Sequence, residues 1–102
     1  MHAITSSADL DRLVATSPHP VIVDFGAAWC TPCRALERLL EQVLPAHPEL
    51  SVVSVDVDAV PELAIRYGVR GVPSLMRFEG GQPVSRQDGL PGRRRLERWL
   101  EG

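Results

Sequence analysis

The sequence has no lysine, and all eleven of its basic residues are arginines. A buried acid in this chain therefore cannot have a lysine as its cationic partner. Long apolar runs are also missing, since none approaches the roughly 20 residues that a membrane-spanning helix requires. The first six residues lack the basic start and apolar stretch of a secretion signal. We therefore expect no membrane span, no secretion signal and a cytoplasmic protein.

An excess of charge of one sign is missing as well. The formal net charge is −2, which gives no electrostatic basis for binding nucleic acid. Residues 93–95 and Arg98 form a local arginine cluster, but Leu96, Trp99 and Leu100 form an apolar stripe in the same segment. This pattern is typical of an amphipathic helix. We interpret the arginines as the solvated face of that helix rather than as a nucleic-acid site.

Cysteine occurs only twice, and both residues lie in the pentapeptide Trp29-Cys30-Thr31-Pro32-Cys33. One Cys-x-x-Cys pair supplies only two of the four ligands of a structural zinc site. The three histidines, His2, His19 and His47, are scattered without ligand spacing. We therefore expect no metal site, and thiol chemistry becomes the first hypothesis.

The position of the two cysteines favours redox chemistry. An apolar run at 21–25 is typical of a buried strand, and apolar residues at helical spacing follow within 34–44. Cys30 then lies at or just before a helix start, where free backbone N–H groups should lower its pKa below the value of about 8.5 of a free thiol. Cys33 lies one turn further on the same face, so the two sulfurs can form a reversible disulfide. Pro32 is tolerated in the first turn of the helix.

The length of 102 residues, with 44% hydrophobic and 24% charged residues, predicts one domain over 1–102. We expect strands at 2–5, 21–25, 50–57, 74–78 and 83–87, the last two joined as a hairpin. Helices are expected from the Ser6 cap to about 16, from the cysteine motif to 44, from an Asp58 cap to Tyr67, and over 92–101. The predicted fold class is α/β, with a mixed central β-sheet flanked by helices on both faces.

Two segments carry a family resemblance. Residues 23–33, which include Asp24 and the cysteine motif, and residues 67–75, with Gly71-Val72-Pro73, resemble the two signature segments of the thioredoxin family. The match extends over essentially the whole chain, because the element order and the separation of Cys33 from Pro73 also agree. The resemblance implies the thioredoxin fold and a thiol–disulfide oxidoreductase that reduces protein disulfides.

The resemblance also implies roles for the matched residues. Cys30 is expected to be the nucleophile that attacks a substrate disulfide, and Cys33 the residue that resolves the mixed disulfide. Pro73 matches a cis-proline beside the redox pair, and with Gly71 and Val72 it is expected to offer backbone groups to an extended substrate. The expected substrate-binding surface further includes Trp29, Thr31, Pro32, Gly89 and Leu90.

The implied partners are disulfide-containing proteins and a thioredoxin reductase that supplies electrons from NADPH. No cofactor is expected on the chain itself, and a monomer is expected. Three alternatives stay open at this point. An oxidase or an isomerase would share the fold and differ in redox poise. A binding subunit would use the same fold and leave its thiols idle.

Asp24 is an acid in the middle of an apolar strand. In the family this position assists proton transfer at the second cysteine, usually with a lysine nearby, but the lysine position falls on Ser54 here. Burial without a cationic partner should raise the pKa of Asp24. We hypothesise that Asp24 still deprotonates Cys33, through water, and that the redox step is therefore sensitive to pH.

Three further positions depart from the family pattern. Thr31 replaces the usual glycine between the cysteines and should alter the balance between thiolate and disulfide. Gly26 stands where many relatives carry a second tryptophan, so Trp29 is the only indole expected beside the cysteines. Asp88 places a carboxylate in a patch that is commonly apolar, which should affect the choice of partner.

Overall fold

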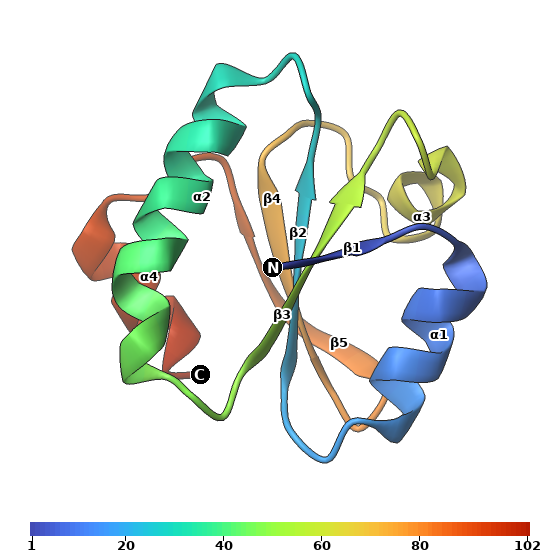
Figure 1. The fold of residues 1–102 in the computed structure, drawn as a ribbon, viewed down its shortest axis with the longest axis horizontal. Coiled ribbons are helices and arrows are strands. Elements are labelled where there is room, and N and C mark those ends of the chain that lie inside the picture. The colour runs from blue at the N-terminus through green and yellow to red at the C-terminus, as the bar shows by residue number, and fades with distance from the viewer.

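The computed structural model describes residues 1–102 as one central sheet with helices on both sides (Figure 1). The strands are β1 (His2–Ile4), β2 (Val21–Gly26), β3 (Ser51–Asp56), β4 (Ser74–Glu79) and β5 (Gln82–Asp88). The helices are α1 (Ser7–Thr16), α2 (Thr31–Val43), α3 (Pro61–Arg66) and α4 (Arg93–Leu100), with a short 3-10 helix η1 (Leu44–Ala46) after α2. This order confirms the predicted alternation of strands and helices.

The sheet is mixed, as predicted, and its strand order is β1-β3-β2-β4-β5. β1 and β2 run parallel to β3, whereas β4 is antiparallel to both β2 and β5. The register places Asp24 of β2 opposite Ser54 of β3 on one side and opposite Leu75 of β4 on the other. The three side chains therefore lie on the same face of the sheet.

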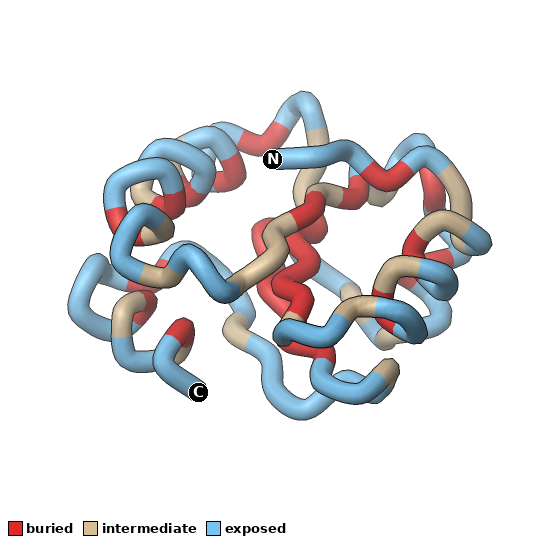
Figure 2. Tube along the Cα trace, turned by 60° about the horizontal axis from the view of Figure 1, so that its bottom comes forward, coloured by how far each residue is buried: buried red, intermediate tan, exposed pale blue.

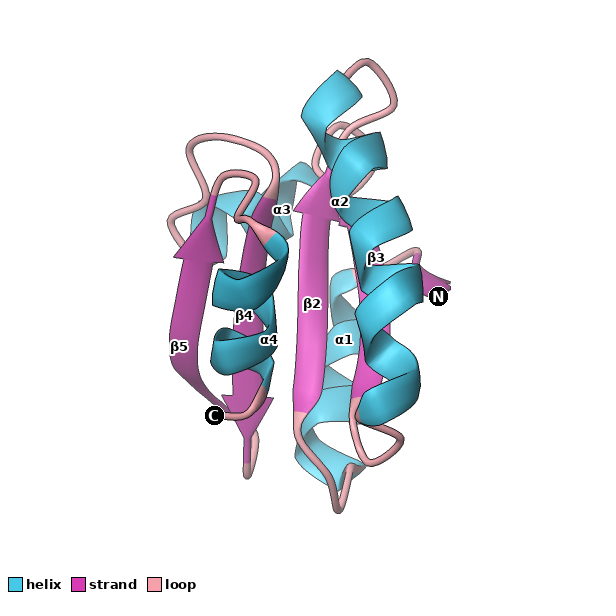
Figure 3. Cartoon of the chain, turned by 90° about the vertical axis from the view of Figure 1, so that its left-hand side faces the viewer, coloured by secondary structure: helices cyan, strands magenta, loops and turns pink.

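Each face of the sheet has its own core. One core joins strand residues such as Val23 and Phe25 to Leu10 of α1 and Leu63 of α3. The other joins Ile22 and Leu75 to α2 and α4. Figure 3 shows α2 and α4 in front of the sheet and α1 behind it, and Figure 2 shows buried segments concentrated along the central strands. Asp24 is two residues beyond Ile22, so it faces α2.

Local chemistry explains where several elements begin and end. The Ser6 hydroxyl accepts a hydrogen bond from the Asp9 backbone N–H at 3.1 Å, which caps α1 as predicted. The β4–β5 hairpin turns at Gly80 and Gly81, which have φ of 58° and 82°. Positive φ at both central residues is the requirement of the tight turn that matches strand twist. The glycines therefore make this hairpin possible.

One helix start was predicted wrongly. Asp58 does not cap α3, since the helix begins at Pro61 and the residue at its N-cap position is Val60, without a side-chain hydrogen bond. The Asp58 backbone N–H instead donates to Asp56 Oδ1 at 2.8 Å in the preceding turn. The Asp58 carboxylate is occupied by a contact with Trp29, described below. Asp58 therefore makes a turn contact with Asp56 and a tertiary contact with Trp29 and does not cap the helix.

None of the four α-helices combines the length and the apolar character that crossing a membrane would require.

Candidate active site

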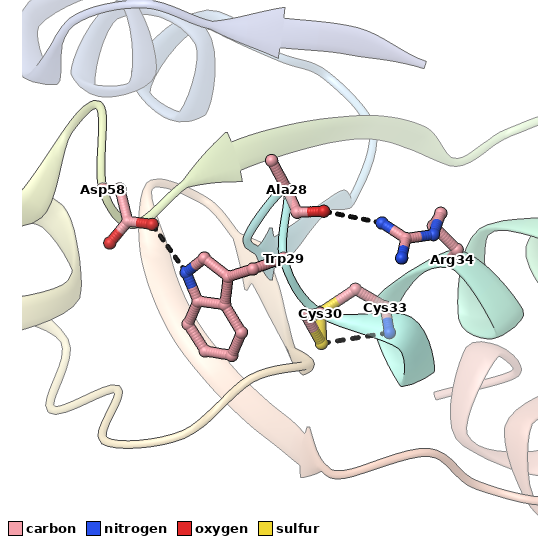
Figure 4. Close-up of a disulfide and its surroundings, with 6 residues drawn as sticks. All are labelled: Ala28, Trp29, Cys30, Cys33, Arg34 and Asp58. Atoms are coloured by element: carbon pink, nitrogen blue, oxygen red, sulfur yellow. Dashed lines mark hydrogen bonds between the residues drawn. A yellow bond between two sulfur atoms is a disulfide. The ribbon is translucent and has the colours of Figure 1, made fainter.

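The two cysteines lie at the start of α2 and are joined by a disulfide bond. Cys30 is the N-cap residue, and its Sγ accepts a hydrogen bond from the Cys33 backbone N–H at 3.2 Å (Figure 4). Thr31 and Pro32 form the first two positions of the helix, where the missing N–H of proline leaves no helical bond unmade. The N-terminal N–H groups of α2 thus surround Cys30 and can stabilise its thiolate.

Only one exposed aromatic side chain adjoins the cysteines. Trp29 is 68% exposed, and its indole Nε1–H donates to Asp58 Oδ2 at 2.8 Å. Figure 4 shows the indole on one side of the cysteines and Arg34 on the other, where the guanidinium donates to the Ala28 carbonyl at 2.6 Å. Cys30 and Cys33 are each only 3% exposed. The cysteines therefore lie between an indole and a guanidinium that are each held by a hydrogen bond.

Pro73 is brought to the same end of the sheet as the cysteines. The Val72–Pro73 peptide bond is cis, and Ser74 pairs with Phe25 in the sheet, so Pro73 lies beside Gly26 at the end of β2. A Cβ atom placed on Gly26 would be 3.4 Å from Cys33 Sγ. Gly26 therefore lies directly against Cys33, and Pro73 adjoins the last pair of β2 with β4 at this end of the sheet.

A cavity of about 560 Å³ extends from Pro73 along the end of the sheet. It brings together Gly71, Val72, Pro73 and Gly89 from the predicted substrate-binding set. Leu90 is not among its lining residues. This leucine is 48% exposed and instead borders a second hollow against α2 and the start of α4. The predicted surface is thus divided into two parts.

The carboxylate at Asp88 is paired rather than free. The Ser74 hydroxyl donates to Asp88 Oδ1 at 2.7 Å, and Arg86 Nη2 donates to the same oxygen at 3.1 Å. The hydrogen bond from Ser74, with a smaller contribution from Arg86, lowers the pKa of Asp88. Sequence reasoning missed Arg86, although alternation along β5 places it on the same face as Asp88.

Asp24 is buried beside this region, with 3% of its surface exposed. Burial raises its pKa from the ordinary value of 3.8 to about 7, and the negative charge of Glu37 adds to the effect. Its Oδ1 has no hydrogen-bond partner, and Ser54 stands opposite it in the sheet. Sequence reasoning missed Glu37, although its position four residues after Cys33 places it on the same side of α2.

No cluster of three or more histidine, cysteine, aspartate or glutamate side chains in the molecule has the arrangement needed to hold a metal ion.

Comparison with known proteins identifies the family. A sequence model with the description Thioredoxin matches residues 2–102. Thioredoxin from Alicyclobacillus acidocaldarius is 40% identical over 82 residues, which are 79% of this chain and 78% of that protein. The bifunctional thioredoxin reductase/thioredoxin of Mycobacterium leprae is 41% identical over 88 residues, which are 85% of this chain and 19% of that protein.

The fold agrees with the same family. The structure of Plasmodium falciparum thioredoxin superposes with a TM-score of 0.91 at 27% identity, over 99% of this chain and 97% of the other. The mixed sheet flanked by helices is therefore the thioredoxin fold, and the two cysteines form its redox-active pair. The chain belongs to the thioredoxin family and is a thiol–disulfide oxidoreductase.

Proposed function

We propose that the protein reduces protein disulfides, with Cys30 as the nucleophile and Cys33 as the resolving residue. The observation that carries the assignment is the position of Cys30 as the N-cap of α2, with Cys33 three residues later and bonded to it. The thiolate of Cys30 attacks one sulfur of the substrate disulfide. A mixed disulfide forms, and the other substrate sulfur leaves as a thiolate.

The second half of the reaction needs a base. Cys33 loses its proton and attacks Cys30 Sγ, which releases the second substrate thiolate and leaves the Cys30–Cys33 disulfide. The two electrons of the dithiol thereby pass to the substrate. Asp24 faces α2 from the sheet, and its unpaired oxygen is free to accept the proton through water. Burial, which raises the pKa of Asp24 to about 7, keeps Asp24 close to the proton affinity that such a base needs near pH 7.

Substrate contacts follow from the surfaces around the cysteines. We assign the binding of an extended substrate segment to the backbone of Gly71, Val72 and Pro73, which line the cavity together with Gly89. The exposed indole of Trp29 supplies an apolar contact on the other side. Thr31, Pro32 and Leu90 are all exposed and complete the proposed docking surface.

Electrons are proposed to come from NADPH through a thioredoxin reductase. The Mycobacterium leprae relative joins a reductase and a thioredoxin in one bifunctional protein, which favours such a partner. A cytoplasmic location fits this supply, because the cytosol keeps thiols reduced through thioredoxin and glutathione. The cycle needs no second copy, since both cysteines belong to one helix start, so we propose that residues 1–102 act as a monomeric domain.

The proposed direction of electron flow can be tested by following NADPH consumption with a thioredoxin reductase and insulin as the disulfide substrate. We expect consumption to depend on this protein. Equilibration with glutathione should give a reduction potential closer to the value of about −270 mV of a reducing thioredoxin than to the value of about −120 mV of a strong oxidant. A potential near the second value would establish an oxidase instead.

The Asp88→Val variant should change partner choice. Valine removes the carboxylate that accepts from Ser74 and Arg86. The Arg86 guanidinium then keeps only the backbone carbonyls of Tyr67 and Gly68 as partners, and the rim of the cavity becomes more cationic and more apolar. Reduction rates with several protein disulfides of different charge should then change relative to one another by roughly threefold, which corresponds to about 0.7 kcal/mol. Equal ratios for variant and wild type would remove Asp88 from substrate selection.

A further inference from the structure

A further cavity lies between the strands β2 and β3 and the helix α2. It has a volume of about 230 Å³ and is lined by Asp24 and Ser54 from the sheet and by Arg34 and Glu37 from α2. This volume has room for several water molecules. The buried Asp24 Oδ1 has no protein hydrogen-bond partner, so water in the cavity is the group that can satisfy it. The cavity therefore connects Asp24 to the exposed surface of α2.

Glu37 is the acidic side chain that α2 presents to this cavity. It lies one helical turn beyond Cys33, and it is exposed to solvent. It makes no ion pair with any arginine, and Arg34, which lines the same cavity, donates to the Ala28 carbonyl at 2.6 Å. Its charge is therefore not neutralised by an ion pair, and Glu37 lines the same cavity as Asp24.

The other groups around Asp24 do not offset the negative charge of Glu37. β3 contributes the neutral Ser54 opposite Asp24 and the exposed Asp56, a further acid that lines the cavity. β4 contributes Leu75, which carries no charge. Arg34 is the one cationic side chain that lines the cavity, and its guanidinium is held at Ala28. The environment of Asp24 is thus more acidic than basic.

We propose that Glu37 is a second carboxylate of the proton-transfer site, coupled to Asp24 across the water-filled cavity, and that its negative charge keeps a proton on Asp24. The inference rests on the proposed role of Asp24 as the base for Cys33. Glu37 acts through Asp24 and touches neither sulfur. Burial, and to a smaller extent the negative charge of Glu37, raise the pKa of Asp24 to about 7.

In the proposed step one proton moves from Cys33 to Asp24 and then to solvent. The Cys33 thiol gives its proton to the Asp24 carboxylate through water, and Asp24 then releases that proton to the cavity and to solvent. No electrons move in this transfer. With Glu37 ionised, its negative charge faces the same cavity as Asp24, so the carboxylate form of Asp24 is disfavoured. Removal of the Glu37 charge should make Asp24 available as a base at lower pH.

The test is the pH dependence of the resolving step in Glu37→Gln, with Glu41→Gln as the matched control. Glu41 lies one turn further along α2, is exposed, and does not line this cavity. Reduced protein is mixed with an aromatic disulfide whose thiolate product absorbs visible light. The first equivalent released reports attack by Cys30, and the second reports resolution by Cys33.

Across a solvent-accessible cavity, with an effective dielectric constant of about 50 between the protein and water values, a unit charge about 10 Å from a carboxyl moves its midpoint by roughly half a pH unit. We therefore expect the midpoint for the second equivalent to fall in Glu37→Gln, with about threefold faster resolution at pH 6 and equal rates at pH 9. Glu37→Asp, which keeps the charge, should stay close to wild type. Superposition of the Glu37→Gln and Glu41→Gln profiles would overturn the inference.

Wild-type protein measured in parallel separates the proposed role of Glu37 from the proposed function of the two cysteines. If it releases no second equivalent, the proposed function itself fails. If it does so and the glutamine variants agree with each other, the role of Glu37 alone is wrong.

Discussion

An Asp24→Asn variant should be more stable than the wild-type protein at pH 8, and most of the gain should disappear at pH 5. Asp24 is buried, and its pKa in the folded protein is raised to about 7 from an ordinary value of 3.8. Between these two values the folded chain holds a proton that the unfolded chain has released. The free energy of unfolding of the wild type therefore falls as the pH rises from about 4 to about 7.

Above pH 7 the wild type carries the full cost of the buried charge. The difference between the two pKa values corresponds to at most about 4 kcal/mol, and asparagine, which does not ionise, avoids this cost. Urea denaturation of the oxidised protein at several pH values from 5 to 8 measures the effect, with Glu41→Gln as a control on an exposed acid. Parallel stability curves for Asp24→Asn and wild type would contradict the account.

The gain in stability should coincide with a loss of function. Asparagine cannot accept the Cys33 proton, so the resolving step should slow and lose the pH dependence that Asp24 gives it. A pH profile of disulfide reduction that superimposes on the wild-type profile would remove Asp24 from the mechanism.

The two cysteine variants should fail in different ways. Cys30→Ser removes the thiolate at the N-cap of α2, so reduction of insulin disulfides by dithiothreitol should fall to the uncatalysed rate. Cys33→Ser keeps Cys30 and its backbone environment but removes the residue that resolves the mixed disulfide. Its turnover should also be lost, while its first attack on the substrate remains. A Cys30→Ser protein that retains catalysis would assign the attack to the wrong residue.

The sequence predicted the fold well because its strongest patterns are set by burial. The apolar run at 21–25 became β2, Val21–Gly26, and the expected mixed sheet with helices on both faces was confirmed. The position of Cys30 at a helix start was also correct. Each of these features depends on local periodicity or on capping, which neighbouring residues in the chain determine.

Contacts between distant segments could not be predicted in the same way. Asp58 looked like a helix cap, but its carboxylate accepts a hydrogen bond from Trp29, 29 residues earlier in the chain. Arg86 neutralises Asp88 only because both lie on one face of β5. Glu37 belongs to no motif and is exposed. Its importance depends on the cavity that forms between α2 and the sheet, which no sequence pattern describes.

The most direct test of the account is covalent trapping of a substrate. Each cysteine variant, in its reduced form, is incubated with a disulfide-containing protein, and the products are analysed by mass spectrometry without reductant. The account predicts a stable mixed disulfide at Cys30 in Cys33→Ser and no adduct in Cys30→Ser. Equal trapping by both variants, or an adduct only in Cys30→Ser, would contradict the assignment of Cys30 as the nucleophile.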